Sequence, residues 1–96
     1  MLSGKQKRYL RGLGHDLKPV ILVGKGEVNT PLVHETTSAL ESHELIKIKL
    51  LESCPMDRYE VADALAGACG AEVAQVLGRT LLLYRKGKEP KIELPA

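Results

Sequence analysis

The residue types that could bind a polyanion are concentrated near the two ends of this 96-residue chain. Residues 1–25 contain six basic residues and one acidic residue, and residues 79–91 contain five basic residues and one acidic residue. Residues 26–78 contain nine acidic residues and only three basic ones. The formal net charge of +2 therefore conceals two cationic segments, which would form one cationic surface if the two ends met in the fold.

The first cationic segment has the periodicity of a helix with separate apolar and basic faces. Its apolar positions are Leu10, Leu13 and Leu17. Its charged positions are Lys5, Lys7, Arg8 and Arg11. A solvated helix face would explain such charges, but no acidic residue lies among them to form helix-stabilising pairs. The pattern therefore favours phosphate contact, and the basic run Arg85 to Lys88 is a second segment of the same type.

Gly24-Lys25-Gly26 lies between an apolar run and a helix start, where phosphate-binding loops occur. The Gly-Lys-Ser/Thr that a Walker motif needs is absent, and Asn29 stands where a dinucleotide fingerprint has its third glycine. A nucleotide cofactor is therefore disfavoured. Two interpretations remain open: a turn whose backbone approaches a sugar-phosphate chain beside Lys25, or a connection that needs only glycine flexibility.

Other chemistry has little support in the sequence. His15, His34 and His43 lack metal-ligand spacing, and no serine lies in a G-x-S-x-G elbow. Cys54 and Cys69 have no CxxC spacing, so we expect two reduced thiols. We therefore expect no catalytic residue, no metal, no cofactor and no small-molecule substrate. No apolar run has the length of a signal peptide or membrane span, so we expect a cytoplasmic monomer that binds no membrane.

Hydrophobic periodicity predicts three helices and four strands in the order α-β-α-β-α-β-β. Pro31 and Asp57 mark two helix starts, Gly14 is expected to end the first helix in the left-handed conformation, and Gly78-Arg79 forms a hairpin turn. The expected helices begin at Ser3, Thr30 and Asp57, and the expected strands are 19–23, 45–51, 73–77 and 80–85.

The strand 45–51 alternates strictly, with Lys47 and Lys49 on one side, so we expect helices to cover only one face of the sheet. Two crossover connections predict a two-layer α/β fold with a mixed four-stranded sheet. We expect a single domain over residues 1–96, with an extended tail over about 87–96.

Taken together, these segments resemble the YhbY-like family, the free-standing bacterial form of the CRM domain (chloroplast RNA splicing and ribosome maturation). The resemblance covers nearly the whole chain, and the joint order and spacing of the segments make it specific. The matching segments are Leu2-Ser3, Lys5-Gln6-Lys7, Leu10-Arg11-Gly12-Leu13, His15-Asp16-Leu17-Lys18-Pro19-Val20, the glycine turn, His43-Glu44-Leu45-Ile46-Lys47, and Gly78 to Arg85.

This resemblance implies a fold similar to the C-terminal domain of bacterial translation initiation factor three. It also implies binding of structured RNA, specifically ribosomal RNA of the large-subunit precursor. The family's G-x-x-G loop corresponds to Gly24, Lys25, Gly26 and Glu27, so its fourth position is not glycine here. Either Gly26 takes over as the permissive residue, or Glu27 favours the next helix and leaves contact to Lys25 and the N-terminal helix.

The leading hypothesis is an RNA-binding factor in assembly of the large ribosomal subunit. The alternative is a protein-interaction module on the ribosome or its assembly factors that uses the acidic middle of the chain, and a small hydrolase or nuclease is a third possibility. The candidate RNA-binding residues are Lys5, Lys7, Arg8, Arg11, Lys18, Gly24, Lys25, Gly26, Arg79, Arg85 and Lys86.

Overall fold

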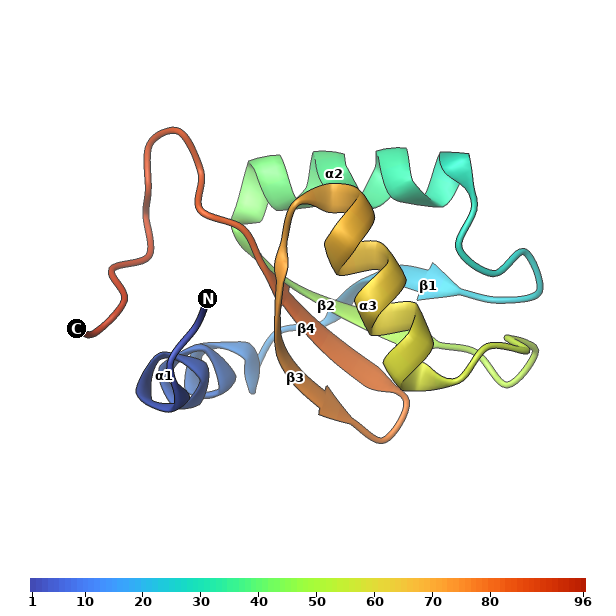
Figure 1. Ribbon diagram of the computed structural model, residues 1–96, viewed down its shortest axis with the longest axis horizontal. Coiled ribbons are helices and arrows are strands. Elements are labelled where there is room, and N and C mark those ends of the chain that lie inside the picture. The colour runs from blue at the N-terminus through green and yellow to red at the C-terminus, as the bar shows by residue number, and fades with distance from the viewer.

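The computed structural model describes residues 1–96 and contains three helices and four strands (Figure 1). The expected α-β-α-β-α-β-β order is confirmed. The elements are α1 (Gly4–Gly14), β1 (Pro19–Val23), α2 (Thr30–His43), β2 (Leu45–Leu50), α3 (Arg58–Cys69), β3 (Glu72–Leu77) and β4 (Thr80–Tyr84).

The four strands form one sheet in the spatial order β1-β2-β4-β3. The pair β1 and β2 is parallel, whereas β2 with β4 and β4 with β3 are antiparallel, so the predicted mixed sheet is confirmed. Gly78, in the β3–β4 turn, has a φ of 58° that glycine adopts without strain. The predicted hairpin therefore forms at the predicted turn.

Polar side chains and one glycine fix the ends of α2 and α3. The Asn29 side chain accepts a hydrogen bond from the Leu32 amide at 2.9 Å, and the Asp57 carboxylate accepts one from the Tyr59 amide at 3.0 Å. Gly70 closes α3 in the left-handed conformation, with a φ of 64°.

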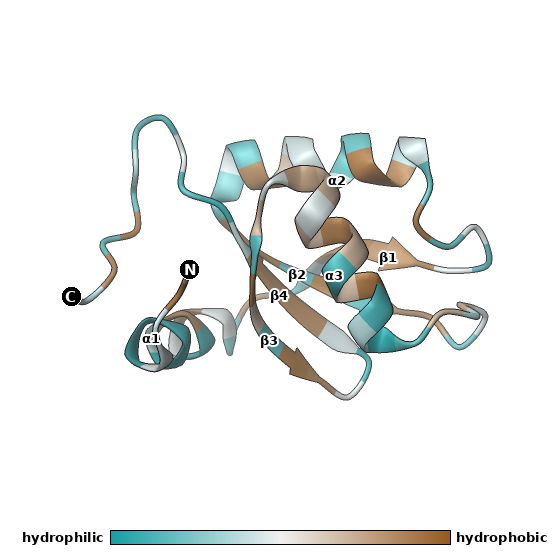
Figure 2. Ribbon diagram, viewed as in Figure 1, coloured by the Kyte–Doolittle hydropathy of each residue, from teal (hydrophilic) through white to brown (hydrophobic).

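Helices α2 and α3 cover one face of the sheet, and the main core lies beneath them (Figures 1 and 2). Alternate strand residues face these helices and belong to this core; Figure 2 shows the hydrophobic residues along the strands. The buried side chains of this core are Ile21, Val23, Leu40, Ile46, Ile48, Leu50, Val61, Ala62, Leu65, Cys69, Leu81 and Leu83.

The expectation that helices cover only one face is wrong, because α1 packs against β2 and β3 on the other face. Lys47 and Lys49 made that face look solvated, but Leu45, Leu82 and Tyr84 make one end of it apolar. Ala74 of β3 belongs to the same apolar end, and Leu2 and Leu10 from the α1 region cover it. The remainder of the face, which includes Lys47 and Lys49, stays open.

Gly14 does not end α1 in the left-handed conformation; His15 caps the helix with right-handed geometry. Gly14 is instead buried against β4, where a Cβ atom would lie 2.6 Å from Leu82 Cδ1. The glycine is therefore required by close helix–sheet packing rather than by backbone conformation.

The segment after β4 contains no helix or strand. The Glu44 carboxylate holds it by accepting backbone hydrogen bonds from Gly87 at 2.8 Å, Lys91 at 2.6 Å and Ile92 at 3.1 Å. Ile92 and Leu94 then pack against the cluster beside α1. None of the helices is both long and apolar enough to cross a membrane.

Candidate nucleic-acid interface

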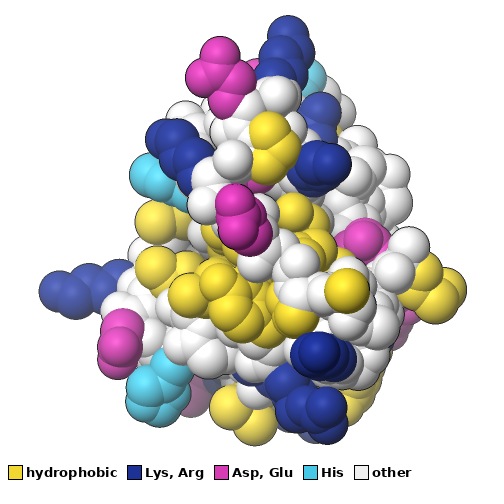
Figure 3. All heavy atoms as spheres, turned by 90° about the vertical axis from the view of Figure 1, so that its left-hand side faces the viewer, with side chains coloured by type: hydrophobic (Ala, Val, Ile, Leu, Met, Phe, Trp, Pro, Cys, Tyr) yellow, Lys and Arg dark blue, Asp and Glu magenta, His cyan; other side chains and the backbone are white.

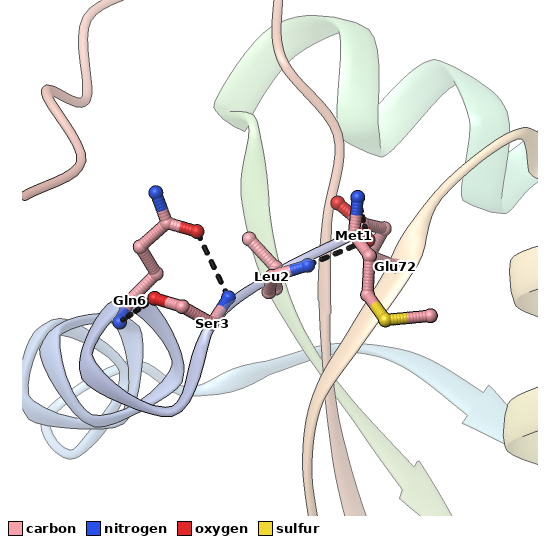
Figure 4. Close-up of polar contacts among 5 residues, drawn as sticks. All are labelled: Met1, Leu2, Ser3, Gln6 and Glu72. Atoms are coloured by element: carbon pink, nitrogen blue, oxygen red, sulfur yellow. Dashed lines mark hydrogen bonds and ion pairs between the residues drawn. The ribbon is translucent and has the colours of Figure 1, made fainter. Parts of the chain in front are cut away.

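Four of the N-terminal cations lie on α1, and all four are exposed: Lys5, Lys7, Arg8 and Arg11. A capping box starts this helix: the Ser3 hydroxyl accepts from the Gln6 amide at 3.1 Å, and the Gln6 side chain accepts from the Ser3 amide at 3.0 Å (Figure 4). The Leu2 amide donates to Glu72 Oε1 at 2.9 Å, which ties the start of the chain to β3 (Figure 4). The sheet therefore orients the basic face of α1.

The two ends of the chain meet beside the sheet. The Gln6 side-chain amide donates to the Pro95 carbonyl at 3.0 Å, and Ile92 and Leu94 pack in the same cluster as Leu2 and Leu10. Figure 3 views the molecule from this end and shows hydrophobic side chains in the centre with Lys and Arg side chains around them. The condition for a joint cationic surface, that the two basic ends come together, is therefore met.

Arg85 and Lys86 lie in a less cationic setting than the sequence indicates. A hollow of about 670 Å³ separates the end of α2 from the first part of the tail. Its charged lining residues include four cations and three carboxylates: Arg85, Lys86, Lys88, Lys91, Glu41, Glu44 and Glu89. Phosphate contact is consequently less favoured here than on α1.

The glycine turn lies at the other end of the molecule, where β1 ends (Figure 1). The Glu27 amide donates to the Gly24 carbonyl at 3.1 Å, and the left-handed residue of the turn is Glu27, with a φ of 53°. Gly26 therefore does not take the left-handed position, and the turn is not shifted by one residue. Glu27 adopts the conformation that a glycine at the fourth position of G-x-x-G would adopt without strain.

A hollow of about 250 Å³ beside this turn is lined by two carboxylates, Glu27 and Glu35. Lys25 is exposed. Arg79 belongs to the same end of the sheet, because its carbonyl accepts from the Leu50 amide at 2.7 Å and the Leu51 amide in turn donates to Val23. Lys25 and Arg79 are thus the cations that this end offers, whereas the carboxylates oppose close approach of a phosphate to the turn.

Cations throughout the molecule lack ion-pair partners. The chain has 14 Lys and Arg side chains, yet the single ion pair joins the N-terminal ammonium to Glu72 at 3.3 Å. Lys18, which precedes β1, is also exposed and unpaired. These charges are available to an external anion without the cost of breaking an internal pair.

Sequence reasoning assigned no role to Glu44, the carboxylate that holds the tail. Three amide donors, with Gly87 the strongest, hold its pKa below the ordinary value of 4.5, against the opposing effect of burial. Burial, followed by the charges of Glu44 and Glu72, raises the pKa of the Tyr84 phenol above 10.0. No signal in the sequence distinguishes Glu44 from the other acidic residues.

Comparison with known proteins assigns the chain to a family. Residues 2–85 match the model of the CRS1 / YhbY (CRM) domain. The chain belongs to the CRM domain family. The predicted family resemblance is therefore confirmed, and it covers α1 through the end of β4.

Three similar proteins match the chain along nearly their full length. The chain is 46% identical to the Probable RNA-binding protein YqeI of Bacillus subtilis, over 99% of this chain and 100% of that protein. It is 37% identical to an RNA-binding protein of Haemophilus influenzae, over 98% of this chain and 95% of that protein. The solution structure of hypothetical protein SAV1595 from Staphylococcus aureus, 42% identical, superposes with a TM-score of 0.84 and covers 99% of this chain and 100% of that one.

Proposed function

We propose that this CRM domain protein binds structured RNA without catalysing a reaction, and that it acts in the cytoplasm as an assembly factor on large-subunit precursor rRNA. The observation that supports RNA binding best is the exposed basic face of α1, whose four cations have no carboxylate partner. The names of the curated relatives support the same class of ligand.

Recognition by shape and phosphate contact fits the side chains better than base stacking does. The chain has three tyrosines and neither phenylalanine nor tryptophan. Tyr84 is buried, and the guanidinium of Arg58 lies 5.1 Å from the ring centroid of Tyr59. Few aromatic faces are left for bases to stack on, so we expect weak sequence specificity.

Binding to a structured RNA should fall steeply with salt, because each phosphate contact releases counterions. Replacing the four α1 cations by alanine should make the log–log salt slope shallower by roughly 3 to 4, measured by fluorescence anisotropy between 50 and 300 mM salt. Unchanged melting temperature of the variant is the control. A slope equal to that of the parent would exclude α1 from the RNA contact. The variant replaces Lys5, Lys7, Arg8 and Arg11.

The ribosomal part of the proposal is tested in cells. Crosslinking followed by sequencing of bound RNA should enrich fragments of the large-subunit precursor. Recovery of unrelated RNAs would overturn the assembly role while leaving RNA binding intact. Affinity for an assembly factor that persists in high salt and needs no RNA would instead favour a protein-interaction module.

A further inference from the structure

The part of the sheet face that α1 leaves open lies between the two cationic ends. We call this surface the open face and define it by two cross-strand rows. The first row runs through Leu22, Lys49, Thr80 and Leu77, which are paired from β1 to β3. The second consists of Lys47 and Gln75, which lie on either side of Leu82, the residue that α1 covers.

The second row borders a hollow of about 420 Å³ between the C-terminal end of α1 and the sheet. Arg11, His15 and Lys47 supply basic groups to its lining, and no carboxylate lines it. Lys47 Nζ donates to the His15 carbonyl at 3.5 Å, a long bond that leaves most of the ammonium's hydrogen-bonding capacity free.

Arg11 and Lys47 lie where they could neutralise the partial negative charge at the C-terminal end of α1. That role does not explain the other cation of the open face. Lys49 is exposed and makes no ion pair or hydrogen bond with another side chain. Beside it, Leu22 and Leu77 are 55% and 63% exposed. Alternating cations and aliphatic groups suit a chain that presents phosphates and sugar faces in turn.

We propose that an RNA strand crosses the open face, with its phosphates on Lys47 and Lys49 and one nucleotide phosphate in the hollow bordered by Arg11 and His15. The strand would link α1 to the end of the sheet where Lys25 lies. This inference rests on the proposed RNA binding and names a surface for it. Charge complementarity selects RNA as the occupant, because every charged group lining the hollow is basic.

Gly12 provides a way to block the hollow. Gly12 is a residue of α1 that lines the hollow, and a Cβ atom on it would meet no other atom within 4 Å. Gly12→Glu should place a carboxylate in the hollow and weaken binding of a structured rRNA fragment at least about tenfold. Gly67→Glu is the matched control, since Gly67 is an exposed position in α3 with equally free space. Glutamate favours helix more than glycine does, so both variants should fold.

A second pair of variants tests the lysines themselves. Lys47→Gln with Lys49→Gln should lower affinity at least about fivefold and make the salt slope shallower by roughly 1.5 to 2. Arg58→Gln with Lys91→Gln removes the same charge from exposed positions outside the candidate site and should change affinity less than about twofold. If the parent binds RNA and each test variant binds as its control does, the open face is not a contact surface. If the parent binds no RNA, the proposed function itself fails.

Discussion

At the residue scale, two glutamates have a positive φ, which the other non-glycine residues avoid: Glu27 at 53° and Glu44 at 60°. Side chains with a Cβ atom pay roughly 1 kcal/mol in this region. Glu44 offsets this cost through its carboxylate, which accepts three amide hydrogen bonds. Glu27 is exposed, and its side chain accepts no hydrogen bond, so the strain at the glycine turn is uncompensated.

Glu27→Gly should therefore stabilise the protein by about 0.5–1 kcal/mol, since glycine adopts this φ freely. Urea unfolding measures the change. The same variant removes a carboxylate beside the turn and restores the G-x-x-G pattern, so we expect RNA affinity to rise about two- to fivefold.

Glu27→Gln separates the two effects, because it removes the charge but keeps the Cβ atom. We expect no stabilisation from it and a smaller gain in affinity. Equal stability of the Gly and Gln variants would contradict the argument from backbone strain.

At the scale of helices and strands, sequence signals from neighbouring residues correctly predicted a helix start and the hairpin turn. Asp57 starts α3 and Gly78-Arg79 closes the hairpin as expected, because capping and turn geometry depend on neighbouring residues. The position of α1 depends on contacts across the chain, such as the packing of Gly14 against Leu82, which no sequence period encodes. The cations of the site could be predicted from the sequence, whereas their division between two ends of the sheet could not.

Fixation of the tail by Glu44 gives a pH-dependent prediction. The pKa of the Glu44 carboxyl is lower in the folded state than in the unfolded state. Such a group stabilises the protein fully at a pH above the unfolded-state pKa, and this stabilisation is lost as pH falls through the folded-state pKa. Glu44→Gln keeps the side-chain shape but offers one acceptor oxygen, so it should destabilise the protein by about 1–2 kcal/mol at pH 7. The difference from the parent should shrink as pH falls from about 4.5, the ordinary pKa, through the lower pKa of the folded state, where the Glu44 carboxylate of the parent gains a proton.

Hydrogen exchange locates this effect. The amides of Gly87, Lys91 and Ile92 should exchange faster in Glu44→Gln than in the parent at pH 7. Glu41→Gln is the control, because Glu41 lines the same hollow but accepts no hydrogen bond from the tail. Unchanged exchange at the three amides would show that Glu44 does not hold the tail.

At the scale of the whole molecule, two groups of cations belong to elements at opposite ends of the longest dimension, which is 38 Å; Figure 1 shows these elements, α1 and the turn after β1. One group lies on α1, and the other includes Lys25 and Arg79 beside the glycine turn. Two groups on one rigid support can bind a long ligand together, whereas a short ligand reaches only one of them.

RNA length should therefore determine which group matters. With a structured RNA longer than the molecule, Lys5→Gln with Lys7→Gln and Lys25→Gln with Arg79→Gln should each weaken binding about five- to tenfold. Their effects should add in free energy, because the two groups are far apart. With an RNA about half as long as the 38 Å axis, one pair of substitutions should have little effect. Equal losses of affinity from both pairs on the short RNA would contradict this prediction. An RNA that cannot span the 38 Å axis contacts only one of the two groups in a single complex.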